Sequence, residues 1–182
     1  MIVLPPAVQA LWDELQTVRE ELLKDVQGTA QAQSDWRPAA NEWSVGEIIH
    51  HLTIAEIHTG KLTTKLIREA QASGAMRPYP HELTAFAPLP LPQPGAAEAP
   101  PVVRPEHGRP IETLIEEMKA VRVRSRESIE KLASIDPRPL TFRHFAFGDL
   151  DLAQWWMLQA RHDRIHLEQI LGAKAAPGFP TP

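Results

Sequence analysis

Two histidines, His162 and His166, lie four residues apart in the last strongly apolar segment of the chain. Residues at this spacing share one face of an α-helix, so both imidazoles can bind the same metal ion. A third candidate, His51, lies in an earlier apolar segment and can reach that ion from a facing helix. Three protein ligands leave a coordination position open for water or substrate, which is typical of a catalytic rather than a structural metal site.

The phase of each predicted helix indicates which histidines point toward the core, because each residue advances about 100° around an ideal helix. His51 lies roughly 60° from the centre of its apolar stripe and His50 roughly 160° away, so His51 borders the core and His50 faces water. His162 and His166 project within roughly 30–40° of the middle of the apolar face of the last helix. The residues that define this face are Leu152, Trp155, Leu158, Ile165 and Ile170.

Ionisable side chains in the middle of an apolar face are unfavourable unless they are paired or coordinated. A single inward histidine is usually a core residue with a backbone hydrogen bond, and that alternative stays open here. Two histidines at a metal-binding spacing, with a third on another helix, favour a metal site.

Two polar residues that follow His51 are weaker catalytic candidates. His58 lies about 80° from the centre of the same stripe, on the flank of His51, where it can serve as a fourth ligand or as a partner of one. Glu56 lies equally far from the centre and could accept a proton from metal-bound water, although a surface glutamate is the simpler explanation. Asp163 and Glu168 point away from the candidate ligands and are expected to be solvated.

The charge balance argues against a nucleic-acid partner. The 182 residues, enough for one domain with a sizeable core, carry a net charge of −4. A nucleic-acid-binding protein normally has a basic stripe, because neutralising phosphates supplies much of its affinity. The densest basic cluster, formed by Arg122, Arg124 and Arg126, is interleaved with glutamates and is expected to be a solvated helix face.

The chain contains no cysteine. This excludes disulfides, zinc–thiolate sites and a cysteine nucleophile, and it agrees with a reducing cytoplasm. The N-terminal run Met1–Pro6 is too short for the apolar part of a signal peptide and lacks a basic leader. No stretch approaches the roughly 18 apolar residues of a membrane span. We therefore expect a cytoplasmic protein without a membrane partner.

Four amphipathic segments must position the histidines. Apolar residues recur at spacings of three and four, which predicts helices over 6–27, 44–72, 110–133 and 149–171. Ser44 and Glu47 form a predicted capping box at the start of the second helix. Four long helices without a convincing series of strands predict an all-α fold, a four-helix bundle, in which metal sites are built from inward side chains of facing helices.

The segment from 75 to about 109 interrupts this pattern with nine prolines, from Pro78 to Pro105. Proline does not fit inside a helix or a central strand, so we expect a long irregular loop between the second and third helices, either a lid or a poorly ordered surface loop. The predicted domain is 1–172, followed by a loose tail at 173–182.

Three blocks of the sequence resemble the DinB/YfiT-like superfamily of metal-binding four-helix bundles. They are Trp36–Pro38 with Trp43–Leu52, then Phe147–Leu150, and finally His162–Ile170. The first resembles the family's first histidine block, the second its glycine turn into the last helix, and the third its closing H-x-x-x-H helix. The family often has His-Pro shortly before the glycine turn. Here His144 is followed by Phe145, which argues against a role for His144 in the site.

The resemblance implies that His51, His162 and His166 bind a divalent metal ion, with zinc or nickel favoured and iron as a further candidate. Characterised relatives include S-transferases and isomerases that use a low-molecular-weight thiol such as bacillithiol or mycothiol, and others are thought to be hydrolases. The implied function is a metal-dependent enzyme that activates an external thiol or water for transfer to a small electrophilic substrate. The alternatives are a hydrolase or a non-catalytic metal-binding or interaction protein. Because relatives often pair through their helices, a homodimer is also implied.

Overall fold

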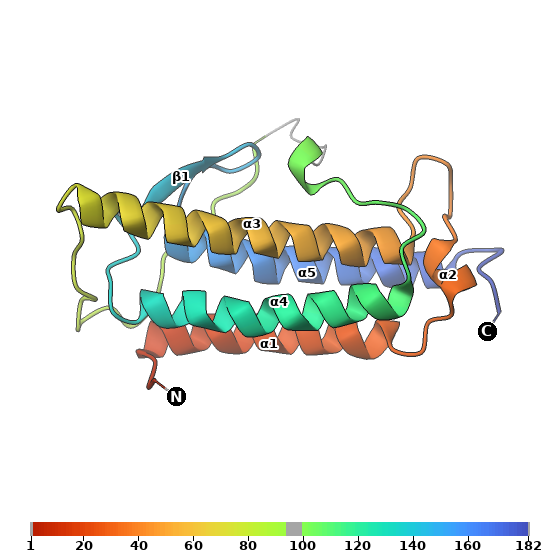
Figure 1. Ribbon diagram of the computed structural model, residues 1–182, viewed down its shortest axis with the longest axis horizontal. Helices are drawn as coiled ribbons and strands as arrows, with labels where there is room; N and C mark the ends of the chain where they lie inside the picture. Colours follow the sequence, from red (N-terminus) through yellow and green to blue (C-terminus); the bar gives the residue numbers. More distant parts are fainter. Residues whose placement is uncertain (1, 94–99, 182) are drawn as a thin grey trace.

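Four long helices run side by side along the long axis of the molecule (Figure 1). They are α1 (Pro6–Val26), α3 (Val45–Ala72), α4 (Ile111–Leu132) and α5 (Leu152–Ala175). The computed structural model describes residues 2–93 and 100–181. Helices α1 and α3 each pack against both α4 and α5, which closes the bundle. The predicted four-helix bundle is confirmed, and none of the described helices is long and apolar enough to cross a membrane.

Caps and breakers place the helix ends close to the predicted positions. At the start of α3, the Ser44 hydroxyl accepts a hydrogen bond from the Glu47 amide, and the Glu47 carboxylate accepts one from the Ser44 amide. Helix α5 departs from the prediction at both ends. It begins only after Asp151, which caps it together with Gln154, and it passes through Gly172 to Ala175. The interior of a helix tolerates a glycine at a cost of about 1 kcal/mol, so Gly172 alone does not end α5.

Four short elements accompany the predicted helices. Helix α2 (Gln31–Asp35) and the 3-10 turn η1 (Pro101–Val103) lie in connecting segments. Strands β1 (Thr141–His144) and β2 (Gly148–Asp151) form an antiparallel hairpin beside the start of α5. Gly148 has a φ of +74°, a conformation that other residues rarely adopt, and it opens β2.

The described parts of the proline-rich segment contact the loop after α4, the β1–β2 hairpin and α3. The Asp136 amide donates to the Arg77 carbonyl oxygen at 2.9 Å, and the Gln93 amide donates to the Ala146 carbonyl oxygen at 2.6 Å. The part from 100 to 109 lies along the first half of α3 (Figure 1). Apart from η1 and an isolated bridge between Pro78 and Ile135, the described residues of this segment form no helix or strand, and residues 94–99 lie outside the described part of the chain.

The predicted loose tail at 173–182 is partly helical and partly packed. Residues 173–175 continue α5. Beyond the helix, the Phe179 ring lies 5.5 Å from the Trp36 ring in an edge-to-face contact, and the Pro180 carbonyl oxygen accepts a hydrogen bond from the Gln33 amide at 2.9 Å. These contacts join the tail to the segment that contains α2.

The bundle core has two apolar clusters, one toward each end. A charged layer separates them, to which each long helix contributes one residue. Its members are Arg19 from α1, Glu56 from α3, Arg122 from α4 and Asp163 from α5. Two cations and two anions balance within the layer, which allows all four side chains to be buried.

The geometry of the charged layer is that of a closed network. Arg19 donates two hydrogen bonds of 2.9 Å to Asp163 and one of 2.7 Å to Glu56. Arg122 donates to Glu56 at 2.8 and 3.1 Å and to Asp163 at 3.1 Å. The predictions of a solvated Asp163, a surface Glu56 and a solvated Arg122 are therefore wrong. Helical phase assigns charged residues to water, whereas here each charge meets its opposite from another helix.

Candidate metal centre

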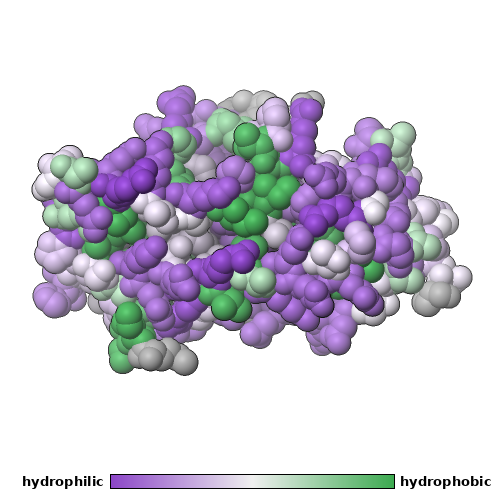
Figure 2. Space-filling model, in the orientation of Figure 1, coloured by the Kyte–Doolittle hydropathy of each residue, from purple (hydrophilic) through white to green (hydrophobic). Residues whose placement is uncertain are grey.

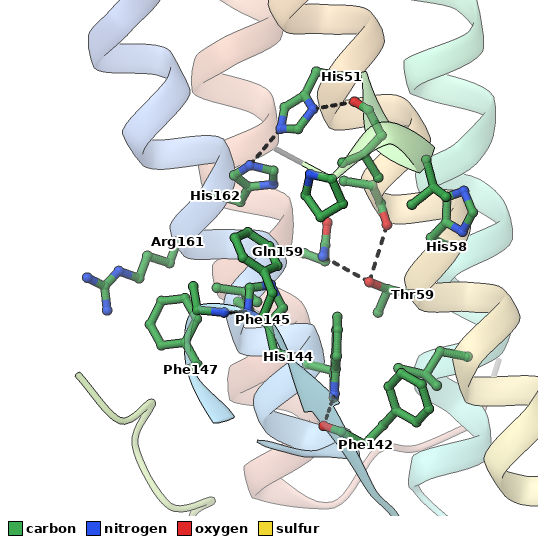
Figure 3. A pocket seen from close by; sticks show the side chains of 18 of the residues that line it. His51, His58, Thr59, Phe142, His144, Phe145, Phe147, Gln159, Arg161 and His162 are labelled. Carbon is green, nitrogen blue, oxygen red and sulfur yellow. Dashed lines mark hydrogen bonds between the residues drawn. The ribbon is translucent and has the colours of Figure 1, made fainter. Parts of the chain in front are cut away.

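His51 from α3 and His162 and His166 from α5 bring three imidazole nitrogens to one point. The Nε2 atom of His162 lies 2.9 Å from that of His51 and 3.0 Å from that of His166. The candidate ligand atoms of all three lie within 4.8 Å of one another. A shared ion at about 2.0–2.1 Å from each nitrogen would hold the ligand atoms at a similar separation. Figure 3 shows His51 and His162 facing each other from the two helices.

Hydrogen bonds on the far side of two rings fix which nitrogen faces the centre. His51 Nδ1 lies 2.7 Å from the Val103 carbonyl oxygen, and His166 Nδ1 lies 2.8 Å from the Gln169 side-chain oxygen. Both oxygens are acceptors, so both Nδ1 atoms carry the proton and both Nε2 atoms present lone pairs to the centre. Metal-binding histidines almost always have such a partner on the second nitrogen.

The donor set therefore fits a metal ion. A neutral His162 has at most one proton to offer from Nε2, and two close lone pairs face it. At least one lone pair then has no donor within the protein, whereas a cation would satisfy all three nitrogens. Imidazole nitrogens are ligands that zinc, nickel and iron ions accept, so the three histidines are compatible with a divalent ion of this type.

Burial keeps all three imidazoles neutral at physiological pH. It is the main cause that lowers the pKa of His51 to about 4, against a raising effect of the hydrogen bond to Val103. Burial, followed by the neighbouring His166 and His51, holds the pKa of His162 well below its usual value. Burial also lowers the pKa of His166. Neutral imidazole is the form that binds metal ions, so the site needs no deprotonation step near pH 7.

The three histidines lie on the wall of a cavity of about 980 Å³. Trp43 packs against them, with its ring 4.7 Å from that of His51 and 6.1 Å from that of His166. Farther along the cavity, the Gln159 side chain of α5 donates to the Thr59 hydroxyl of α3 at 2.9 Å and holds the two helices together (Figure 3). The cavity gives a small molecule access to the candidate centre.

The β1–β2 hairpin supplies aromatic lining that sequence reasoning did not assign to the site. Phe142, Phe145 and Phe147 lie in the cavity wall, as does Trp155, whose indole donates to the Phe142 carbonyl oxygen at 3.1 Å. The available signal was the cluster of aromatic residues in a stretch without helical periodicity. His144 also lines the cavity but does not join the three-histidine cluster.

Comparisons with known proteins agree with this architecture. The sequence profile of the DinB superfamily matches residues 14–170. The chain belongs to the DinB superfamily. Among solved structures, it is similar to one described as the crystal structure of TT2238, a four-helix bundle protein, with a TM-score of 0.63 and 18% identity. That similarity covers 91% of this chain and 99% of the other, and at this identity it shows the fold alone. A search of curated proteins found no match.

In this DinB-superfamily chain, the two weaker catalytic candidates lie apart from the histidine cluster. His58 is exposed at the edge of the cavity, and Figure 3 shows its ring away from His51 and His162. Both carboxylate oxygens of Glu56 are held by arginines in the charged layer. Burial by itself would raise the pKa of Glu56, but Arg19 and Arg122 lower it to about 2. Glu56 is therefore poorly suited to accept a proton in the cavity.

The prediction that His50 faces water is wrong. Its side chain is buried, and its Nδ1 atom accepts a hydrogen bond of 2.9 Å from the Glu106 amide. The proline-rich segment covers this flank of α3, which the phase of a single helix cannot reveal. His50 is nevertheless separate from the cluster formed by His51 and the two histidines of α5.

Proposed function

We propose that this DinB-superfamily protein is a metal-dependent enzyme that acts on a small molecule. His51, His162 and His166 would hold one divalent cation at the wall of the cavity. The observation that carries the proposal is the convergence of three neutral imidazoles, two of them oriented by hydrogen bonds on the far nitrogen, beside a cavity of about 980 Å³.

A cation held by three protein ligands lowers the pKa of a thiol or water at an open position and so supplies a nucleophile near neutral pH. The chain's own residues contribute orientation and shielding. Val103 and Gln169 fix the rings of His51 and His166, and Trp43 covers them on one side. Because the chain has no cysteine, any thiol must be an external low-molecular-weight compound.

The reaction that we favour is transfer of such a thiol to an electrophilic small molecule. A sulfur–carbon bond forms, the bond to the leaving group breaks, and the thiol proton passes to solvent. Hydrolysis with water as the nucleophile is the alternative reaction. A purely structural metal site is a weaker candidate, because structural zinc sites are usually closed by four protein ligands, whereas three histidines beside a cavity leave a position open.

Metal analysis of protein purified without an affinity tag tests the metal site. We expect close to one zinc, nickel or iron ion per chain, released by a chelator. Absence of any such ion, both as purified and after incubation with each metal, would overturn the proposal. The metal-loaded protein would then be screened with pairs of thiols and electrophiles, with thiol consumption measured in parallel with hydrolysis.

Two further expectations from the sequence remain proposals, namely a homodimer and a cytoplasmic location. Light scattering tests the first, since a dimer would have twice the 20.4 kDa mass of the chain. A monomer at high micromolar concentration would contradict it. Fractionation of cells that express the untagged protein tests the second.

A further inference from the structure

The cavity is basic although the protein is acidic. Five of its lining residues are lysines or arginines, and none of the lining residues in the described part of the chain is an aspartate or glutamate. The whole chain has 19 basic and 23 acidic residues, so its composition does not explain this bias. The basic lining residues are Lys61, Lys65, Arg68, Arg143 and Arg161.

Most of these cations lie at the end of the cavity remote from the histidines. Lys61, Lys65 and Arg68 follow one another at spacings of four and three, which places them on one face of α3. With a rise of about 1.5 Å per residue, Lys61 lies about 15 Å and Lys65 about 21 Å along the helix from His51. Arg143 comes from strand β1.

These cations have few carboxylate partners. Among the described residues, no carboxylate lies within ion-pair distance of Lys61, Arg68 or Arg143. Lys65 makes an exposed contact of 4.0 Å with Glu69, and its ammonium lies 4.9 Å from the centre of the Phe142 ring in the cavity wall. Exposed pairs of this kind contribute about 0–1 kcal/mol, so a ligand can displace it. Arg161 does not belong to this group, because its guanidinium lies 5.5 Å from the centre of the Phe147 ring and extends away from the histidines (Figure 3).

The rest of the lining is apolar and partly open to solvent. Four large apolar side chains with exposed fractions of 42–65% belong to the cavity wall, namely Val102, Phe142, Phe145 and Ile165. Figure 2 shows apolar side chains grouped in the upper middle of the molecule, with hydrophilic side chains on either side. Exposed apolar side chains that gather in a hollow mark a ligand-binding groove.

We propose that the cavity binds an elongated, mostly aromatic or apolar molecule that carries a carboxylate or phosphate at the end remote from the histidines. The apolar wall would hold the body of the molecule, and Lys61, Lys65 and Arg143 would pair with its anion. The binding of such a molecule is inferred from the charge and shape of the cavity. Only its identification as the enzyme's substrate rests on the proposed function.

A second hollow of about 550 Å³ gives the main competing location for the anion. It lies between α3 and α4 and is also bordered by Lys61, Lys65 and Arg68. Its border includes Glu127, which disfavours an anion, and Arg124 and Lys131 on α4. Variants on α4 can therefore separate the two locations.

The test uses three probes with one skeleton, 4-(biphenyl-4-yl)butanoate and the corresponding alcohol and amine. Binding to metal-free protein is measured by isothermal titration calorimetry at low salt and pH 7.5. We expect the carboxylate to bind about tenfold more tightly than the alcohol, as one charge-assisted hydrogen bond provides, and the amine to bind most weakly. Equal affinities for the acid and alcohol, or no binding of either, would overturn the proposal.

A matched pair of variants locates the anion. The triple change Lys61→Gln, Lys65→Gln and Arg143→Gln should remove the tenfold preference and leave alcohol binding unchanged, which also shows that the variant is folded. The control removes three exposed cations of α4 by changing Lys119, Arg124 and Lys131 to Gln, and it should keep the preference. Because Lys61 and Lys65 border both hollows, the α4 control decides between them, and loss of the preference in that control would place the anion in the second hollow and overturn the proposal. Since these measurements need no metal, a failed metal analysis would leave the ligand class standing.

Discussion

Two of the three histidines of the candidate centre make a hydrogen bond to an oxygen on the side of the ring away from the centre. The carbonyl oxygen of Val103 and the side-chain oxygen of Gln169 hold the protons of two rings on the outer side. This arrangement leaves the inner nitrogens with lone pairs before any ion arrives. Binding then requires little rearrangement of the side chains.

Alanine replacement of His51, His162 or His166 should remove most metal affinity, because two imidazoles bind a divalent ion far less tightly than three. Metal content after dialysis against a weak chelator measures this. His58→Ala should leave the content nearly unchanged, since His58 is exposed and outside the cluster, and His50→Ala should do the same. If His50→Ala abolishes binding and His51→Ala does not, the ligand assignment on α3 is wrong.

Replacing Gln169 by leucine should weaken metal binding by about 10- to 100-fold, as is typical for the loss of a partner on the outer nitrogen of a ligand. The His166 ring stays in place, but its tautomer is no longer fixed. Competition with a chromogenic chelator gives the change in Kd. Glu168→Gln, an exposed neighbour, is the control and should bind like the wild type.

At the scale of the elements, the charged layer sets the register of all four long helices. Each helix has one residue in the layer, so sliding any helix by one turn would leave buried charges without partners. Buried pairs contribute little net stability compared with apolar residues of equal volume, but removing one partner is strongly destabilising. The layer therefore contributes more to fixing the register of the four helices than to the free energy of unfolding.

Glu56→Gln should reduce the free energy of unfolding by about 3–5 kcal/mol, because Arg19 and Arg122 would keep their charges with only one carboxylate between them. Urea unfolding followed by circular dichroism measures the change. Glu69→Gln on the surface of the same helix is the control and should change stability by about 1 kcal/mol or less. Equal effects of the two changes would show that the layer is less important than its burial suggests.

Acid should destabilise the fold in a window set by Glu56. Its folded pKa, about 2, lies below the usual value of 4.5 under the influence of Arg19, Arg122 and a hydrogen bond from Ser125, with the anionic Asp163 also in the layer. A carboxylate with a lowered folded pKa stabilises the protein above its unfolded pKa. This contribution should be complete above about pH 4.5 and should be lost as the pH falls toward 2.

The measurement is the free energy of unfolding between pH 7 and pH 2.5 for the wild type and for Glu56→Gln. The pKa values of Glu47 and Asp136 are lowered as well, Glu47 by Arg37 and Asp136 by its hydrogen bond with Arg138, so some slope remains in the variant. The wild type should show the steeper slope below pH 4.5. Identical slopes would contradict the role assigned to Glu56.

At the scale of the whole molecule, the bundle and the histidine cluster could both be predicted from the sequence. The apolar stripes, the capping box at Ser44 and the proline starts gave three of the four long helices to within about a residue. The four-residue spacing of His162 and His166 directly indicated two of the three members of the cluster. These features depend on short-range patterns, which a single sequence contains.

The parts that could not be predicted depend on contacts between distant segments. The inward face of α5 passes through Trp156, Ala160, Asp163 and Leu167. Ile165, which was taken as part of that face, is half exposed and lines the cavity. The error arose because apolar residues alone defined the predicted face, which placed Asp163 in water, whereas the arginines of α1 and α4 make its burial favourable. The cover over His50 likewise comes from a segment more than 50 residues away.

The hydrogen bond between His51 and Val103 has a consequence for energetics. Val103 belongs to η1, which also forms part of the cavity wall. The same residue therefore contacts His51 of the candidate centre and lines the cavity. A compound that orders η1 by filling the cavity would also order the ring of His51, a proposed metal ligand. If such a compound strengthens the binding of the proposed metal ion, reciprocity requires the ion to strengthen the binding of the compound by the same factor. We therefore expect the Val103 carbonyl group to couple the two proposed binding events.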